Sequence, residues 1–256
     1  ALRALGCTEL CVLFVRYAGD IPNEYLEALL DLDERAQSFA LQNVQDPSEV
    51  EGHFILSRQF SPLAGLEGVG EHLRAHPTRF FDAMVSLGTA LFVRQLARAE
   101  AAGLRLLVVE DGGYVMPTVT RLAAGGRTVR ALAEEHGAGA VPPALARRRL
   151  ADVLAERLIG SVEHTRNGFD RLAAVERDIG RLARPAFSIA VSRLKVEEES
   201  EGVAAGVLAA LEAVYHALGY VLSHRRPLVI GSRGAIGTRL VRQLSTRVGV
   251  NPVLGV

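Results

Sequence analysis

A glycine-rich stretch near the end of the sequence has the spacing that brings backbone N–H groups to a phosphate. Residues 227–237 read Pro-Leu-Val-Ile-Gly-Ser-Arg-Gly-Ala-Ile-Gly, and an amphipathic helix is expected directly after them, over 238–246. A strand, a glycine turn and a helix in this order present backbone N–H groups to an anion. Gly234 would let the backbone approach a pyrophosphate, and Gly237 would let the helix pack closely on its strand.

The same spacing also fits an ordinary strand-to-helix turn, so the motif leaves both interpretations open. Counted from Gly231 the pattern is G-x-x-G-x-x-G, whereas in the form G-x-G-x-x-G Ser232 replaces the first glycine. Residues 251–256 are expected to form the second strand of this unit, and the ribose-reading acid would follow that strand. The sequence ends before that position, so this unit leaves the choice between NAD and NADP open and indicates an incomplete dinucleotide-binding domain. The residues expected to contact the cofactor here are Gly231, Ser232, Arg233, Gly234, Ala235, Ile236 and Gly237.

Polar residues also follow three other predicted strands, where ligands bind in open α/β sheets. Asp111 and two glycines end the apolar run 104–110. Residues 160–168 read Gly-Ser-Val-Glu-His-Thr-Arg-Asn-Gly. After the third strand, Lys195 lies four residues before Glu199, so the two side chains would share one helix face. Each feature taken singly also fits an ordinary turn or a solvated ion pair.

Apolar patterning predicts strands that alternate with helices, which indicates an α/β fold with a doubly wound, Rossmann-like parallel sheet. The expected strands are 9–17, 53–60, 104–110, 159–163 and 187–191, besides those of the glycine turn. The expected helices are 24–32, 66–75, 79–102, 117–124, 128–136, 143–158, 165–176 and 198–223. Residues 1–200 would form a substrate-binding domain, 201–224 a linking helix and 225–256 the start of a Rossmann domain.

Composition excludes several classes of partner. Lys and Arg total 29 and Asp and Glu total 29, so no net charge draws the chain to nucleic acid. Cys7 and Cys11 stand alone, which argues against a metal site and favours reduced thiols in the cytoplasm. The apolar run 203–222 contains Glu212 and His216, so a buried helix is expected rather than a membrane span.

The order and spacing of these motifs resemble the adenosylhomocysteinase (S-adenosylhomocysteine hydrolase) family. Residues 110–113 read Glu-Asp-Gly-Gly where that family has Asp-Asp-Gly-Gly, and 160–168 stand at its Gly-x-Ser-Glu-Glu-Thr-Thr-Thr-Gly element. Residues 185–195 run from Pro-Ala to a lysine as in the family, and Glu199-Ser200 stand at its Asp-Asn. The resemblance covers about 104–256, and no motif in 1–103 matches.

This resemblance implies a bound NAD that oxidises the 3′-hydroxyl of a nucleoside or related sugar, followed by elimination, hydration and return of the hydride. It assigns Lys195 to deprotonation of the 3′-hydroxyl, Glu199 to the ribose hydroxyls and Asp111 to acid–base chemistry near the 4′ and 5′ carbons. His164 replaces a ribose-binding glutamate and is expected to take over that contact. Further cofactor contacts would come from Thr165, Arg166, Asn167 and Ser200.

Two other functions stay open at this stage. The altered run 164–167 and the unmatched first hundred residues favour a non-catalytic dinucleotide-binding homologue or subunit. The glycine spacing is also compatible with an NAD(P)-dependent dehydrogenase that performs net hydride transfer. In each case the expected ligand is a small molecule and the expected assembly is a homo-oligomer, with neither nucleic acid nor membrane as a partner.

Overall fold

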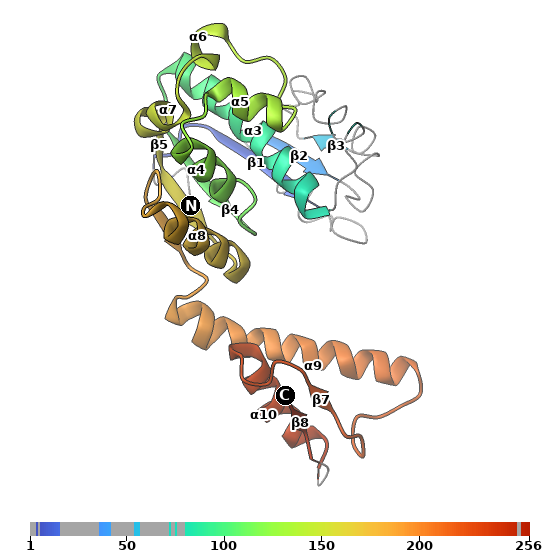
Figure 1. Cartoon of the computed structure of the whole chain (residues 1–256). Coiled ribbons are helices and arrows are strands. Elements are labelled where there is room, and N and C mark those ends of the chain that lie inside the picture. The colour runs from blue at the N-terminus through green and yellow to red at the C-terminus, as the bar shows by residue number, and fades with distance from the viewer. Residues whose placement is uncertain are drawn as a thin grey trace. The chain divides into compact units, whose positions relative to one another are not determined.

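The computed structural model describes residues 4, 6–15, 36–41, 54–56, 72, 75, 80–249 and 252–256 (Figure 1). The chain separates into two compact units, Ala1–Phe187 and Ser188–Val256. This boundary lies earlier in the chain than the division after residue 200 that the sequence predicts. The helices predicted over 24–32 and over most of 66–75 lie outside the described residues.

The first unit contains two small sheets. One has the order β1-β2-β3, with β1 and β2 parallel and β3 antiparallel to β2. The other is a three-stranded parallel sheet of order β4-β5-β6, whose strands β4 and β5 pair from Leu106 to Glu110 and from Leu158 to Glu163. The strands are β1 (Leu10–Val15), β2 (Ala36–Leu41), β3 (Phe54–Leu56), β4 (Leu106–Glu110), β5 (Leu158–Glu163) and β6 (Ala186–Ser188).

Helices supply most of the core of this unit. They are α3 (Phe80–Ala102), α4 (Met116–Ala124), α5 (Val129–Glu135), α6 (Pro143–Ala146), α7 (Leu150–Arg157) and α8 (Arg166–Ile179). The side chains of Leu87 and Leu96 on α3 are fully buried, together with Leu132 on α5 and Leu154 on α7. Burying such leucines contributes about 2 kcal/mol each to folding. The core therefore fixes the carboxyl ends of β4 and β5, where polar residues follow.

The structure departs from the sequence expectations for this unit in two places. The single helix predicted over 143–158 is two helices, α6 and α7, because the backbone at Arg148 and Leu150 pairs with the segment before α5. Val129 donates to the carbonyl of Arg148, and Leu150 donates to the carbonyl of Arg127. Strand β2 was not predicted, since its sequence Ala-Gln-Ser-Phe-Ala-Leu lacks a run of β-branched residues.

The second unit is a strand–turn–helix–strand element that packs on a long helix. It consists of the π-helix η3 (Leu194–Glu199), α9 (Ser200–Ala217), β7 (Leu228–Val229), α10 (Ala235–Arg247) and β8 (Leu254–Gly255). Strands β7 and β8 are parallel, and α10 lies along α9 (Figure 1). Its core consists of Leu208, Leu222, Val229, Leu244 and Val248.

The helix predicted over 198–223 is shorter than expected. It ends at Ala217, because Gly219 follows with φ +75°, a left-handed conformation that closes helices at their carboxyl end. At its start, the hydroxyl of Ser200 donates to the carbonyl of Lys195 at 3.1 Å, five residues back, where the chain passes from π-helix to α-helix.

The mixed α/β class is confirmed, with a small parallel sheet in the first unit and a parallel strand pair in the second. The described residues form three separate sheets. None of the helices within the described residues has the length and apolar composition needed to cross a membrane.

Candidate functional site

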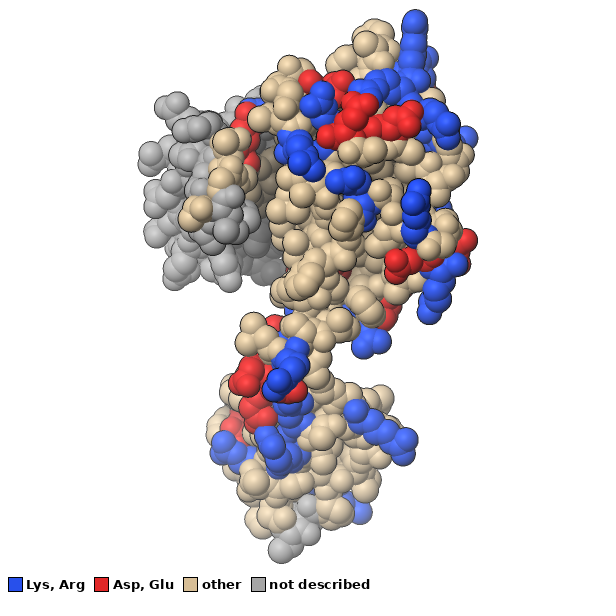
Figure 2. All heavy atoms as spheres, turned by 90° about the vertical axis from the view of Figure 1, so that its left-hand side faces the viewer, with Lys and Arg blue, Asp and Glu red and all other residues tan. Residues whose placement is uncertain are grey.

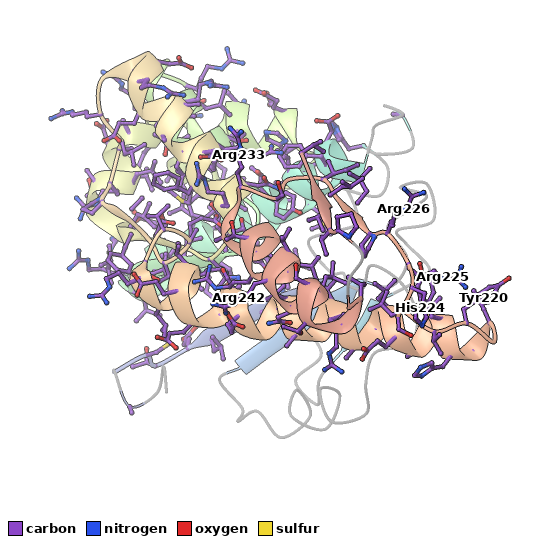
Figure 3. All side chains as sticks on the ribbon, turned by 90° about the horizontal axis from the view of Figure 1, so that it is seen from below. Tyr220, His224, Arg225, Arg226, Arg233 and Arg242 are labelled. Atoms are coloured by element: carbon purple, nitrogen blue, oxygen red, sulfur yellow. The ribbon has the colours of Figure 1, made fainter. Side chains whose placement is uncertain are left out.

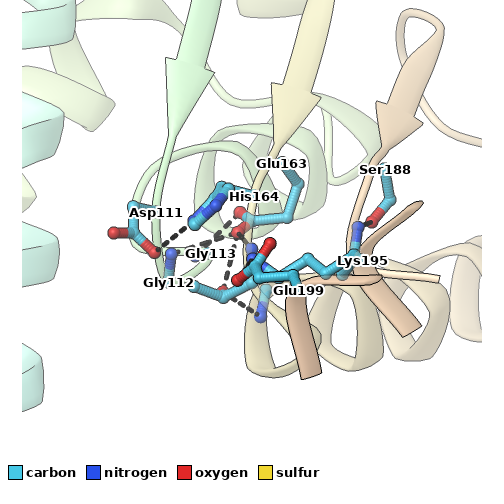
Figure 4. Close-up of polar contacts among 11 residues, drawn as sticks. Asp111, Gly112, Gly113, Glu163, His164, Ser188, Lys195 and Glu199 are labelled. Atoms are coloured by element: carbon cyan, nitrogen blue, oxygen red, sulfur yellow. Dashed lines mark hydrogen bonds and ion pairs between the residues drawn. The ribbon is translucent and has the colours of Figure 1, made fainter. Parts of the chain in front are cut away.

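The turn after β4 is built around the carboxylate of Glu163, the last residue of β5. Its two oxygens accept from the N–H of Gly112 at 3.1 Å and of Gly113 at 3.0 Å, and from the N–H and hydroxyl of Thr165, both at 2.7 Å (Figure 4). The side chain of Glu163 is fully buried. The hydrogen bonds of this buried carboxylate join the turn after β4 to the start of α8.

Glycines make room for this carboxylate. Gly112 and Gly113 have φ of +130° and +64°, which turns their N–H groups toward Glu163 and which side-chain-bearing residues rarely adopt. A Cβ on Gly168 would overlap the Glu163 carboxylate, and a Cβ on Gly112 would overlap the ring of Tyr114. The glycines at both ends of this arrangement are therefore required by the fold itself.

A second carboxylate, that of Glu110 at the end of β4, caps the helix that follows. It accepts from the N–H of Val115 at 2.9 Å and of Met116 at 3.2 Å, at the start of α4. Burial raises the pKa of Glu110 to about 7, an effect that the nearby charge of Glu163 increases and these backbone hydrogen bonds oppose. Both Glu110 and Glu163 thus hold backbone N–H groups of the loop that contains Asp111.

Asp111 and His164 lie side by side at the exposed carboxyl edge of this sheet. The Nδ1 atom of His164 is 3.5 Å from the Asp111 carboxylate, and the two side chains are 46% and 69% exposed (Figure 4). The backbone N–H of His164 donates to the carbonyl of Glu110 at 3.0 Å, which fixes its position beside β4. An imidazole next to a carboxylate is a pair of groups that can donate and accept protons in general acid–base catalysis.

The residues after His164 take local structural roles. The Thr165 hydroxyl caps α8 by accepting from the N–H of Gly168 at 3.1 Å. Arg166 pairs with Asp170 at 2.9 Å, and the side chain of Asn167 is exposed. Thr165, Arg166 and Asn167 are predicted cofactor contacts, and the hydroxyl and N–H of Thr165 already form hydrogen bonds within the protein.

In the second unit, Lys195 and Glu199 form the ion pair that their spacing predicts. The Nζ atom of Lys195 lies 3.4 Å from the Glu199 carboxylate, and the lysine side chain is mostly buried at 19% exposure. Lys195 and Glu199 both lie on η3. Arg239 joins η3 to the glycine turn, because its guanidinium donates to the carbonyl of Glu197 at 3.0 Å and to that of Ala235 at 2.8 Å. Lys195 therefore belongs to a helix that is bonded to the first turn of α10.

The three glycines of the turn after β7 differ in what requires them. Gly231 has φ +84°, and a Cβ on Gly237 would overlap the carbonyl of Gly231, so the turn itself requires both. A Cβ on Gly234, which has φ −72°, would meet only the Gly231 oxygen at 3.4 Å, an ordinary contact. The protein's own packing thus leaves the space above Gly234 open.

The β8 strand end closes one side of this turn. The carbonyl of Val256 accepts from the N–H of Gly231 at 2.9 Å and from the N–H and hydroxyl of Ser232 at 3.0 and 3.1 Å. Thr238 fixes the other side, since its hydroxyl donates to the carbonyl of Ser232 at 2.9 Å. The N–H groups of Gly231 and Ser232 are therefore used, and the N–H of Gly234 donates to the carbonyl of Gly231 at 3.0 Å, so what stays open at Gly234 is the space beside its Cα.

Positive charge predominates around this turn. Residues 213–256 contain six arginines and no Asp or Glu. Arg239 and Arg242 pair with Glu201, and with Thr238 these residues line a cavity of about 270 Å³. The exposed cations without an ion pair among the described residues of this unit are Arg225, Arg226 and Arg233 (Figure 3). Figure 2 shows Lys and Arg side chains of this unit interspersed with Asp and Glu side chains.

Sequence reasoning missed the roles of Glu110 and Glu163 because each was treated as part of a motif rather than as a buried group. The available signal was position: each is the last residue of an apolar strand, and a glycine or threonine follows within three residues. The four predicted catalytic residues form two pairs, Asp111 with His164 in the first unit and Lys195 with Glu199 in the second. No cluster of His, Cys, Asp and Glu among the described residues could hold a metal ion.

Comparisons with protein-family models, with curated proteins and with solved structures find no match for this chain.

Proposed function

We propose that this chain is an NAD-dependent, adenosylhomocysteinase-like enzyme that acts on a nucleoside or related sugar by transient oxidation of its 3′-hydroxyl, elimination and hydration. The observation that carries the proposal is the open space at Gly234. Gly231 and Gly237 serve the turn, whereas no contact with the described residues requires a glycine at 234. In dinucleotide-binding turns a glycine is needed at this position because the pyrophosphate lies close to the backbone.

The position of Lys195 supports the same proposal. Arg239 bonds the helix of Lys195 to the first turn of α10, so a cofactor on that turn would lie near the lysine. When bound, the nicotinamide supplies acceptance and return of a hydride. Lys195 would hold the proton of the substrate hydroxyl, and Glu199, 3.4 Å from it, would orient the amine and the neighbouring hydroxyl.

The pair at the β4–β5 edge would act on the same class of substrate. The Asp111 carboxylate and the His164 imidazole are exposed and 3.5 Å apart, so either can take a proton from a bound sugar and return it. Glu163 and Glu110 would not touch the substrate, because their oxygens are occupied by backbone donors. Their part is to hold the loop that carries Asp111.

Replacement of Gly234 tests the cofactor site directly. In the full chain, Gly234→Ser should remain folded, because serine is a favoured residue at the first position before a helix. Its side chain should nevertheless fill the space above the turn and weaken NADH binding by about tenfold or more, measured by fluorescence titration. Unchanged binding in a folded Gly234→Ser variant would contradict this placement of the diphosphate.

Substrate experiments separate this proposal from its alternatives. Incubation of the NAD-loaded protein with adenosine or adenosylhomocysteine should produce a transient, substoichiometric NADH absorbance. Net NADH release that follows substrate consumption would instead favour a simple dehydrogenase. Dinucleotide binding without any hydride transfer would favour a non-catalytic homologue. The hydrogen bonds of Thr165 to Glu163 favour this alternative, because they occupy a predicted cofactor contact.

A further inference from the structure

Helix α9 exposes a face that carries no Asp, Glu, Lys or Arg. Its two carboxylates, Glu201 and Glu212, both pair with arginines of α10. The exposed residues of the helix are Gly, Ala, Val and one His, and the side chains of Val203, Val207 and Val214 are between 38% and 55% exposed. A helix face in contact with water normally carries charged side chains, so this face has the composition of a covered one.

Two glycines lie about one turn apart on this face, and no contact with the described residues requires them. A Cβ on Gly202 or on Gly206 would meet no described atom within 4 Å. Glycine weakens a helix interior relative to alanine, but it permits another backbone to approach closely. Towards its other end the face carries larger exposed side chains, those of Val214 and Leu218. Together these residues favour a second helix as the occupant of the face.

The two ends of α9 carry opposite charge. Glu197, Glu198 and Glu199 directly precede the helix, and Arg225 and Arg226 lie in the loop that follows it (Figure 3). Neither Glu198 nor Arg226 has an ion pair among the described residues. A second α9 that runs antiparallel to the first would bring the acidic end of each helix to the basic end of the other, and the two helix dipoles would oppose each other. The charges at this face therefore complement those of another copy of the same chain.

From these observations we propose that the exposed face of α9 is a self-association surface, on which the α9 of a second copy packs antiparallel. Ala210 lies midway between Gly202 and Leu218, so it would lie near the twofold axis of such a pair. The same symmetry places Gly206 of each copy opposite Val214 of the other. Gly202 would lie opposite Leu218, so that small residues receive large ones along the whole contact. The surface lies outside the proposed cofactor and substrate contacts and does not depend on them.

Analytical ultracentrifugation of the full chain tests the proposal, with a charge placed at the centre of the face. The wild-type chain should sediment as a dimer or as an assembly of dimers. Ala210→Glu should raise the dissociation constant of the dimer about tenfold or more, because two like charges would meet near the axis. Ala205→Glu is the matched control, since Ala205 is also exposed on α9 but lies about 140° around the helix from Ala210. This control should keep the wild-type dissociation constant, and circular dichroism should show both variants folded.

Cysteine cross-linking tests the orientation of the two helices. Under mild oxidation, Ala210→Cys should form a disulfide between two copies. Ala217→Cys should not, because its two thiols would lie about 20 Å apart along an antiparallel pair. The wild-type chain, which retains Cys7 and Cys11, gives the background of this assay.

Three outcomes would overturn the proposal. A monomeric wild-type chain would mean that the first unit of the same chain, or a partner of another kind, covers the face. A dimer that Ala210→Glu leaves intact would place the interface elsewhere on the protein. Equal cross-linking of Ala210→Cys and Ala217→Cys would mean that the helices run parallel, which the charges at their ends oppose.

Discussion

Two glycine turns follow strands in this protein, at Gly112–Gly113 after β4 and at Gly231–Gly237 after β7. In the first turn, the N–H groups of both glycines point to an anion that the protein supplies, the buried carboxylate of Glu163. In the second, the first N–H groups bond to the carbonyl of Val256, and the space at Gly234 stays open. The first turn is filled from within, and the second can accept a ligand.

This difference shows why a glycine motif alone does not identify a ligand site. Both turns concentrate backbone donors, which favours an anion in either place. What distinguishes them is whether the fold brings its own carboxylate to the donors. The first turn therefore serves to place Asp111, and the second retains unfilled space next to Arg233, which has no ion pair among the described residues.

The largest effect is expected when the internal anion of the first turn is removed. Glu163→Ala leaves the N–H groups of Gly112, Gly113 and Thr165 without their acceptor, so the free energy of unfolding should fall by about 4 kcal/mol. Urea denaturation monitored by circular dichroism measures this loss. Glu163→Gln, which keeps one acceptor oxygen, should lose less, and a loss below about 1 kcal/mol in Glu163→Ala would contradict an internally filled turn.

The carboxylate of Glu110 should make stability depend on pH. Its folded pKa of about 7 lies above the ordinary value of 4.5, so the folded state binds the proton more tightly than the unfolded state. Stability should therefore decrease as pH rises from about 4.5 to about 7 and then level off, by at most about 3 kcal/mol. Urea denaturation at pH 5 and pH 8 measures the change. Glu110→Gln should abolish it, and an identical pH profile in that variant would exclude Glu110 as the cause.

The second turn should tolerate a side chain at one glycine but not at the other. Gly237→Ala forces a Cβ against the carbonyl of Gly231 and should destabilise the folded chain by about 2 kcal/mol in thermal or urea unfolding. Gly234→Ser is the matched control, whose stability should change by less than about 1 kcal/mol. Equal destabilisation by both substitutions would remove the distinction between a structural and a ligand-facing glycine.

The smallest effect is expected at the exposed edge of the first turn. Asp111→Asn removes one member of a pair that is 3.5 Å apart and largely exposed, so stability should change by less than about 0.5 kcal/mol in the same unfolding assay. Enzymatic turnover should nevertheless fall markedly, because the carboxamide cannot exchange a proton and only His164 of the pair remains. A marked loss of stability would mean that Asp111, like Glu163, serves the fold.

Local sequence patterns predict much of the secondary structure for physical reasons that act over short distances. The apolar faces of α3 and the apolar run of β4 are visible without any tertiary contact, and Thr128 and Thr165 cap α5 and α8 with their own hydroxyls. The helix predicted over 143–158 is interrupted by a segment that is distant in the sequence. The backbone around Arg148 forms hydrogen bonds with residues near Arg127 instead of continuing the helix that the local pattern favours.

The sequence by itself determined that this chain alternates strands and helices, that glycines follow two of the strands, and that Lys195 pairs with Glu199, because each depends on residues a few positions apart. Only the tertiary structure decided that one turn is filled by Glu163, about fifty residues away in the sequence, and that Gly234 faces open space. Burial and the meeting of distant segments determine where an anion can sit, and neither property is encoded in the spacing of a motif.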